Sequence, residues 1–270
     1  MLITAEIPSE WGELEDLVVA ILNEAGLVAK RNESISLPRG TVVIDVLAEE
    51  THDGIVHRIV CECKNWKTNV PQGVIHAFRT VIQECGAHRG YIISRVGFQT
   101  GAHEAAESTN IQLVTFQEFQ KIYFEKWYES RLWAIERNIK GFHSYYEMVF
   151  GKPGYSRLES DEERTTYDAV WNRYRFAGVL LTAYSPFQLM LGRRPEVPEL
   201  PLDQSRIAEL EGEGEGEGEG VVFPDDIKAV AAYREFFGLL EGYAVAGLRD
   251  LRSVNPLTRS EPEDQTPHHE

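Results

Sequence analysis

An alternation of strand and helix patterns between residues 55 and 115 constrains the fold of this chain more than any other feature. Apolar runs at 55–64, 90–94 and 111–115 predict strands, and amphipathic patterns at 73–85 and 101–108 predict helices between them. Successive strands joined through helices pair in parallel by right-handed crossovers. The pattern therefore predicts a sheet whose later strands are parallel.

A hairpin and a helix are expected before this alternation. Residues 41–48 are rich in β-branched residues, and the turn His52-Asp53-Gly54 joins them to the 55–64 strand as a hairpin. Apolar residues at helical spacing predict a helix at 10–24. Two short extended pieces are expected at 27–31 and 35–37. Residues 1–120 are thus predicted to form a compact α/β domain with a mixed central sheet flanked by helices.

The remainder of the chain is predicted to be all-α. Aromatic residues recur at helical intervals from 116 to 150, and further long helices are expected at 161–191 and 225–251. Glu-Gly repeats from Glu211 to Gly220 cannot bury a core and predict a disordered linker. The predicted parts are a helical region at 121–200, an acidic linker at 201–220, a C-terminal helix at 221–252 and a disordered tail at 253–270.

Composition restricts the cell compartment and the partners. The chain has 270 residues, three cysteines and a net charge of −16. No apolar run approaches the ~20 residues of a membrane span, and the N-terminus has no signal-peptide pattern, so we expect a cytoplasmic protein without a membrane partner. Bases outnumber acids between residues 63 and 103, which is compatible with one focused nucleic-acid contact surface.

Acidic and basic side chains converge at the expected hairpin. Glu62 and Lys64 share one face of their strand because successive side chains alternate. Asp45 can lie close to Glu62 across the hairpin, and Glu15 on the first helix is a further candidate. Two carboxylates at a sheet margin suit Mg²⁺, which prefers oxygen ligands and keeps several waters. Lys64 is then expected to orient a metal-activated water or to neutralise charge that develops on a phosphate.

The same residues resemble a known pattern. Asp45, sixteen residues and then Glu62-Cys63-Lys64 resemble the Asp…(Asp/Glu)-x-Lys signature of the PD-(D/E)XK nuclease superfamily, with Ile44 in place of its usual proline. Leu14-Glu15 resembles the Phe-Glu start of Mrr-like restriction endonuclease domains, and Cys61–Lys64 resembles their Gln-Cys-Lys strand. The 90–99 segment and Ile111-Gln112-Leu113 are similar to the later strands and the Gly-Phe-Thr turn of that family. The resemblance covers about residues 10–120.

The resemblance implies a restriction-endonuclease-like fold and a metal-dependent DNA endonuclease acting in restriction or antiviral defence. Asp45, Glu62 and Lys64 carry over as catalytic residues, with Glu15 and Gln72 as weaker candidates. Asp45, Glu62 and the Cys63 backbone carbonyl are the candidate ligands of Mg²⁺, for which Mn²⁺ is expected to substitute. DNA is the expected substrate. The helical region is expected to oligomerise, sense a signal or dock a partner protein.

Several alternatives stay open from the sequence. The same site pattern fits a structure-selective, junction-resolving nuclease, and the scaffold alone fits a non-catalytic module that binds DNA or a partner. Lys67 and the 73–85 helix face of His76, Arg79 and Gln83 are candidate DNA contacts, although such a face is more often only solvated. Cys61 and Cys63 are expected to be buried packing residues and not metal ligands.

Overall fold

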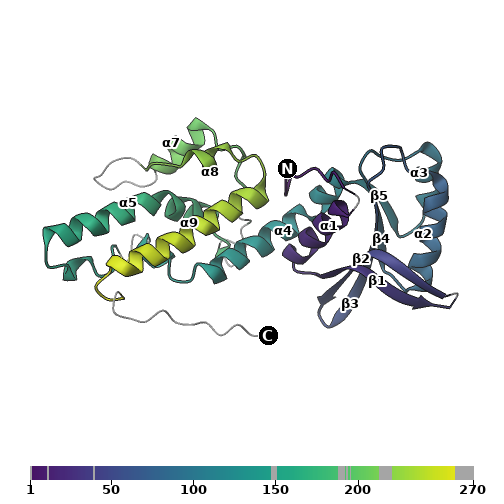
Figure 1. Cartoon of the computed structure of the whole chain (residues 1–270), viewed down its shortest axis with the longest axis horizontal. Coiled ribbons are helices and arrows are strands. Elements are labelled where there is room, and N and C mark those ends of the chain that lie inside the picture. Colours follow the sequence, from purple (N-terminus) through teal and green to yellow (C-terminus); the bar gives the residue numbers. More distant parts are fainter. Residues whose placement is uncertain are drawn as a thin grey trace. The chain divides into compact units, whose positions relative to one another are not determined.

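The structure is a computed structural model that describes residues 2–10, 12–38, 40–146, 151–187, 192, 194, 196–212 and 221–258. The chain divides into two compact units, Met1–Arg131 and Leu132–Glu270, which are described separately. In the first unit helices lie on both sides of a sheet, and the second unit is helical (Figure 1). Among the described residues, no helix combines the length and the apolar character needed to cross a membrane.

Five strands form the sheet of the first unit in sequence order. They are β1 (Val28–Leu37), β2 (Gly40–His52), β3 (Ile55–Lys64), β4 (Arg89–Ser94) and β5 (Ile111–Thr115). The pairs β1–β2 and β2–β3 are antiparallel, whereas β3–β4 and β4–β5 are parallel. The predicted hairpin, parallel strands and mixed α/β fold class are confirmed. The two short extended pieces expected before residue 38 are instead one continuous strand, because β1 pairs with β2 along most of its length.

Helices cover both faces of this sheet (Figure 1). Helix α1 (Glu13–Glu24) contacts β1, β2 and β3, and it starts three residues later than the sequence predicts. Helices α2 (Gln72–Glu84) and α3 (Thr100–Ala106) contact each other and the parallel strands. Lines of apolar residues on these elements meet the sheet, as the helical periodicity predicts.

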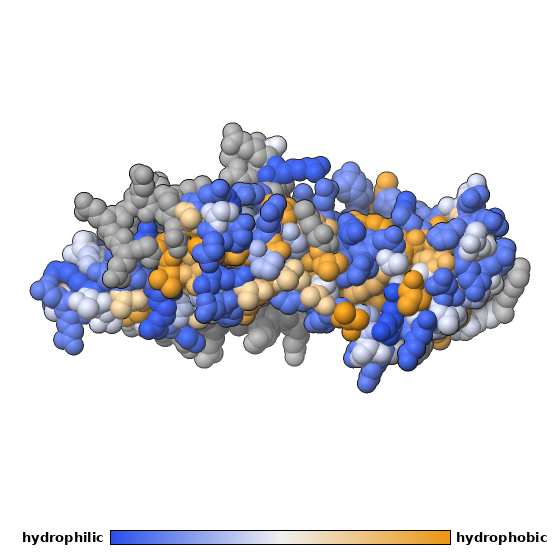
Figure 2. Space-filling view, turned by 90° about the horizontal axis from the view of Figure 1, so that it is seen from above, coloured by the Kyte–Doolittle hydropathy of each residue, from blue (hydrophilic) through white to orange (hydrophobic). Residues whose placement is uncertain are grey.

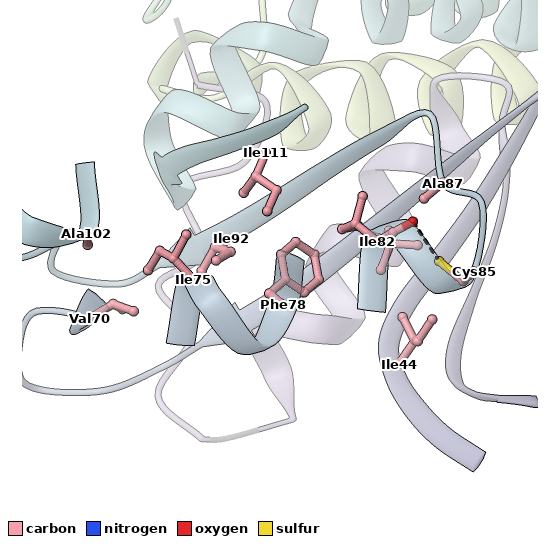
Figure 3. Close-up of a cluster of buried hydrophobic side chains, with 11 residues drawn as sticks. Ile44, Val70, Ile75, Phe78, Ile82, Cys85, Ala87, Ile92, Ala102 and Ile111 are labelled. Atoms are coloured by element: carbon pink, nitrogen blue, oxygen red, sulfur yellow. Dashed lines mark hydrogen bonds between the residues drawn. The ribbon is translucent and has the colours of Figure 1, made fainter. Parts of the chain in front are cut away.

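A buried apolar cluster lies between the sheet, α2 and α3 (Figure 3). Phe78 and Ile82 of α2 lie in it, and burial of each such side chain contributes about 1.5–3 kcal/mol. Gly90 of β4 lets α2 come close, because a Cβ there would lie 2.7 Å from Ile82 Cδ1 and 2.8 Å from Phe78 Cε1. Close packing in this cluster fixes the position of α2 and therefore of Gln72 at its start.

The first unit extends beyond the predicted boundary at residue 120. Helix α4 (Phe116–Asn138) begins directly after β5, and its Phe119 and Tyr123 rings lie against the Tyr91 ring of β4. Trp127 Nε1 donates a hydrogen bond of 2.7 Å to Glu24 Oε2 in α1. These contacts attach the first part of α4 to the sheet domain, so the compact unit ends at Arg131.

The second unit is built around two long helices, α5 (Asp161–Ala183) and α9 (Tyr233–Val254), which pack on each other. A capping box of Ser160 and Glu163 starts α5. Gly247 of α9 allows the close approach, since a Cβ there would lie 2.8 Å from Tyr174 Cγ of α5. Shorter elements complete the unit, namely two 3₁₀ turns (His143–Tyr145 and Tyr155–Arg157), α7 (Gln204–Gly212) and α8 (Asp225–Ala229).

Several helical boundaries differ from the sequence predictions. The disordered linker predicted at 201–220 is wrong at its start, because α7 forms there and buries Leu202, Ile207 and Leu210; residues 213–220 lie outside the described residues. The single helix predicted at 221–252 is two helices, because the backbone at Val230 and Ala232 is extended. Helix α9 also continues into the predicted tail as far as Val254, and residues 259–270 of that tail are not described.

Candidate active site

Asp45 lies in β2 where the regular pairing with β3 stops. The register of the two strands runs from His52↔Ile55 to Val46↔Cys61. One residue further, the Cys63 backbone N–H donates to Asp45 Oδ2 at 2.8 Å. On the other side of β2, Asn32 of β1 adopts a φ of 55°, and the β1–β2 register passes from Arg31↔Val46 to Glu33↔Ile44 around it. The hydrogen bond from the Cys63 N–H holds the Asp45 carboxylate against the end of β3.

Glu62 and Lys64 are joined by an ion pair at the carboxyl end of β3. Lys64 Nζ donates to Glu62 Oε1. Both side chains are largely buried, with 16% of the Lys64 side chain and 27% of the Glu62 side chain exposed. Lys64 Nζ also lies 5.5 Å from the centroid of the Trp66 ring, within cation–π range. The predicted sharing of one strand face is confirmed by this pair. The lysine is held between a carboxylate and an aromatic ring.

Glu15 of α1 is the most buried acid of the group. Its side chain has no exposed surface, and its Oε2 accepts a hydrogen bond of 2.6 Å from Arg31 Nε in β1. Its other oxygen, Oε1, has no hydrogen-bond partner. A buried carboxylate oxygen without a partner is costly, so the site is suited to an additional cation or water at this position.

Burial and the neighbouring carboxylates raise the proton affinity of Glu62. Burial raises the pKa of Glu62, and the nearby charge of Asp45 raises it further, while Lys64 acts in the opposite direction. Glu15 makes a smaller contribution of the same sign as Asp45. Glu15, Asp45 and Glu62 therefore act on one region of space, and a bound divalent cation would offset their mutual repulsion.

The two neighbouring cysteines do not supply thiolates. Cys61 and Cys63 are buried, and burial raises the pKa of both thiols, with further contributions from the nearby acids. Protonated thiols are poor metal ligands. The donor set at this rim is therefore oxygen-based, which fits a hard cation such as Mg²⁺ or Mn²⁺ better than a soft metal.

The candidate metal ligands are not arranged in this structure to bind a cation directly. Across the described ranges, no group of three or more His, Cys, Asp or Glu side chains is placed to hold a metal ion. Glu62 is engaged by Lys64 and Asp45 by the Cys63 N–H. Oxygen donors, the unpartnered Glu15 Oε1 and the raised pKa of Glu62 together fit a divalent cation.

The weaker candidates lie on α2 and in the loop after β3. Gln72 is the first residue of α2, and its Nε2 lies 3.1 Å from His76 Nε2. No hydrogen bond of the described residues joins Gln72 to Asp45, Glu62 or Lys64. Arg79 and Gln83 are exposed on the same helix as His76, and Lys67 is exposed in the loop after β3. These positions leave the DNA-contact residues as predictions.

Three residues that contact the site or its loop were not expected from the sequence. Arg31 pairs with Glu15 and also donates from Nη1 to Asp16 Oδ1 at 2.8 Å. Trp66 stands beside Lys64, and Asn65 Nδ2 donates to the Glu10 backbone carbonyl at 2.7 Å, which ties the loop after β3 to the segment before α1. Lone residues of these types carry no recognisable spacing. Only the adjacency of Asn65 and Trp66 to Lys64 in the chain could have drawn attention to them.

Comparisons with known proteins find matches to part of this chain. Residues 8–123 match the model of a family described as restriction endonuclease, the Mrr catalytic domain. Among solved structures, the crystal structure of a protein of unknown function, AF1548, matches with a TM-score of 0.36 and 19% identity over 47% of this chain and 76% of that chain. No curated protein matches. Residues 8–123 therefore match a restriction endonuclease family, which is consistent with the Mrr-like PD-(D/E)XK nuclease domain that the sequence predicts.

Proposed function

We propose that this protein is a Mg²⁺-dependent DNA endonuclease that hydrolyses phosphodiester bonds in restriction or antiviral defence. The observation that carries the proposal is the convergence of Asp45, Glu62 and Lys64 with the buried Glu15 at one rim of the sheet. Cleavage is proposed to take place in the cytoplasm, where the three thiols stay reduced.

Each residue has a distinct task in this proposal. Asp45 and Glu62 hold the cation, with the Cys63 carbonyl as a further oxygen ligand and Glu15 balancing charge directly or through water. When bound, the cation supplies a polarised phosphoryl oxygen and a more acidic water. Lys64, once released from Glu62, directs its ammonium group to the attacking water or to the charge that develops on the phosphate. The Cys63 N–H keeps the Asp45 carboxylate in place throughout.

The direct test is cleavage of supercoiled plasmid with Mg²⁺, with Mn²⁺ and with a chelator. Loss of a group that stabilises transition-state charge typically costs about 10²–10³-fold in rate, and we expect that loss for Lys64→Ala. Lys121→Ala, an exposed lysine on α4, is the matched control and should cut like the wild type. Full activity of both Lys64→Ala and Asp45→Ala would refute the assignment.

Two further arms separate the alternative functions. Equal cutting of plain duplex and a branched four-way junction supports a general endonuclease, whereas cutting of the junction alone identifies a structure-selective enzyme. Calorimetry with Mg²⁺ and Mn²⁺ tests the non-catalytic alternative, because a binding-only module predicts no metal uptake and no difference between the wild type and Glu62→Gln.

The helical unit is proposed to oligomerise or to dock a partner protein. It has its own buried core, which includes Tyr167, Phe236 and Phe237, and it also exposes Phe187 and Val222 to solvent. Such side chains mark a protein contact where they belong to one contiguous apolar patch. Light scattering on the full chain over a range of concentrations should show self-association; a constant monomer mass would leave only the partner-docking role.

A further inference from the structure

A cavity of about 400 Å³ opens at the amino ends of β3 and β4, whereas Lys64 lies at the carboxyl end of β3. Its lining comes from β2, β3, β4, the turn before β4 and α4, all within the first unit. The volume is within the roughly 300–1,000 Å³ of small-molecule sites. No residue of the candidate active site lines it, so the cavity needs a separate explanation.

Positive charge dominates the polar lining. Arg89 Nη1 donates to the neutral amide oxygen of Gln112 at 3.1 Å, and within the described part of the chain no carboxylate pairs with this guanidinium. Lys126 of α4 forms an ion pair with Glu50, the single acid of the lining. Arg89 is therefore a cation without a counter-charge at the mouth of the cavity, in a chain whose net charge is −16.

The imidazole rings of His57 and His88 line the cavity, and the hydrogen bonding of His88 defines one N–H donor. Arg58 donates its backbone N–H to His88 Nδ1 at 3.0 Å. An accepting Nδ1 places the proton of the neutral ring on Nε2, so His88 has one N–H donor left to offer. The His57 ring contacts His88 edge-on, with centroids 5.2 Å apart and an angle of 64°. Flat rings and one fixed donor are suited to a flat, polar ligand.

The rest of the lining carries no negative charge. Tyr91 and Tyr123 are buried, and burial raises the pKa of Tyr123, so its phenol stays neutral at physiological pH. Ile59 and Ile122 supply apolar surface, and Ile122 is 41% exposed. The lining thus combines the cations Arg89 and Lys126, the carboxylate of Glu50 that pairs with Lys126, and apolar and aromatic surface.

We propose that this cavity binds a small phosphate ester of nucleotide size. Arg89 and Lys126 hold the phosphate, because a guanidinium donates two parallel hydrogen bonds to phosphate oxygens and an ammonium adds a positive charge. The ring or sugar of the ligand rests on His57, His88 and the isoleucines, since the cavity is far larger than a phosphate group needs. This site is independent of the proposed nuclease reaction and goes beyond it.

The test is isothermal titration calorimetry on the full chain with a chelator present, so that no metal at the candidate active site can capture phosphate. The ligands are the four ribonucleoside 5′-monophosphates, adenosine and inorganic phosphate. We expect at least one monophosphate to bind, adenosine to bind at least tenfold more weakly than AMP where AMP binds, and Arg89→Gln and Lys126→Gln each to weaken binding tenfold or more. Lys121→Gln, on the same helix as Lys126, should bind like the wild type.

Three results of these titrations would overturn the proposal. They are absence of binding by all four monophosphates, unchanged affinity in both Arg89→Gln and Lys126→Gln, and equal affinity for inorganic phosphate and the nucleotides. A short 5′-phosphorylated DNA duplex that displaces the nucleotide at lower concentration would also overturn it, because the ligand would then be DNA. Circular dichroism of each variant checks its fold, and plasmid cleavage is scored separately, so failure of either proposal is recognisable.

Discussion

At the residue scale, Arg31 is the side chain on which the buried acid depends. Its Nε holds Glu15 Oε2 at 2.6 Å, and the other Glu15 oxygen has no partner. Removing a partner from a buried charge is costly, whereas replacing both partners is often tolerated. Arg31 is therefore expected to hold the Glu15 side chain in position.

Arg31→Gln should lower the free energy of unfolding by about 1–3 kcal/mol, because Glu15 is left buried without its cation. Urea unfolding measures this change. Combining Arg31→Gln with Glu15→Gln should recover part of the loss, and Lys228→Gln, which breaks an exposed pair with Asp225, should cost under about 1 kcal/mol. Additive losses in the double variant would contradict the coupling of Arg31 with Glu15.

Trp66 is expected to affect catalysis through Lys64. The ring lies 5.5 Å from Lys64 Nζ, and a cation–π contact contributes about 0.5–2 kcal/mol. Trp66→Ala should therefore lower the rate of plasmid cleavage by up to about thirtyfold without changing metal binding, whereas Trp66→Phe should keep most of the activity. If the alanine and phenylalanine variants cut equally well, the ring has no positioning role.

The predictability of the site differs from residue to residue. Asp45, Glu62 and Lys64 could be found because their spacing follows from the two-residue period of a strand and from a hairpin. Arg31 could not, since its contact with Glu15 depends on how α1 packs over β1, which no local pattern encodes. Gln72 was suggested by its place at a helix start, yet its side chain bonds to His76.

At the scale of elements, the packing of α2 on β4 depends on the absence of a side chain at Gly90. Gly90→Ala should cost about 1–3 kcal/mol of unfolding free energy, because its methyl would lie 2.7–2.8 Å from Ile82 and Phe78. Gly73→Ala in the first turn of α2 meets no atom within 4 Å and should be neutral or slightly stabilising. Equal thermal denaturation midpoints for the two variants would contradict this account.

The contact between α5 and α9 should depend on pH. Tyr174 Oη donates to Asp250 Oδ2 at 2.7 Å, and this hydrogen bond is the main reason that the pKa of Asp250 is lowered. A lowered pKa in the folded state stabilises the fold above the unfolded value of about 3.9, and that contribution disappears as the pH falls through the folded value.

Tyr174→Phe should therefore lower the free energy of unfolding by up to about 1.5 kcal/mol at pH 7. The difference from the wild type should shrink as the solution is acidified below about pH 4, and urea titrations at several pH values measure it. A difference that stays constant down to pH 3 would show that Asp250 is not the responsible acceptor.

Element types were more predictable than their limits. The strands β2 to β5 and the helices α1 to α3 follow from hydrophobic period and turn residues. The single strand β1 was divided in the prediction, because polar residues in the middle of Val28–Leu37 hide a strand that β2 stabilises by pairing. Helix α7 was missed because the Glu-Gly repeats directly after it dominated the composition of 201–220.

At the scale of the whole molecule, the net charge of −16 opposes association with DNA. Binding is expected to rely on the few bases around the site, including Lys64, Lys67 and Arg79. Contacts with three phosphates predict a slope of about −2.7 for log affinity against log salt concentration.

Fluorescence anisotropy with labelled duplex in chelator measures this slope. Lys67→Gln and Arg79→Gln should each make it shallower by about 0.9, and Lys30→Gln, an exposed lysine of β1, should leave it unchanged. Unchanged slopes for Lys67→Gln and Arg79→Gln would mean that DNA binds on another surface.

Strand order in the sheet equals strand order in the chain. Every ladder therefore joins strands that follow one another in the chain, and the parallel ladders β3–β4 and β4–β5 are closed by helical crossovers. Glu15, Asp45, Glu62 and Lys64 all belong to the first 64 residues. During synthesis these four side chains can begin to come together while β4, β5 and the helical unit are still being translated.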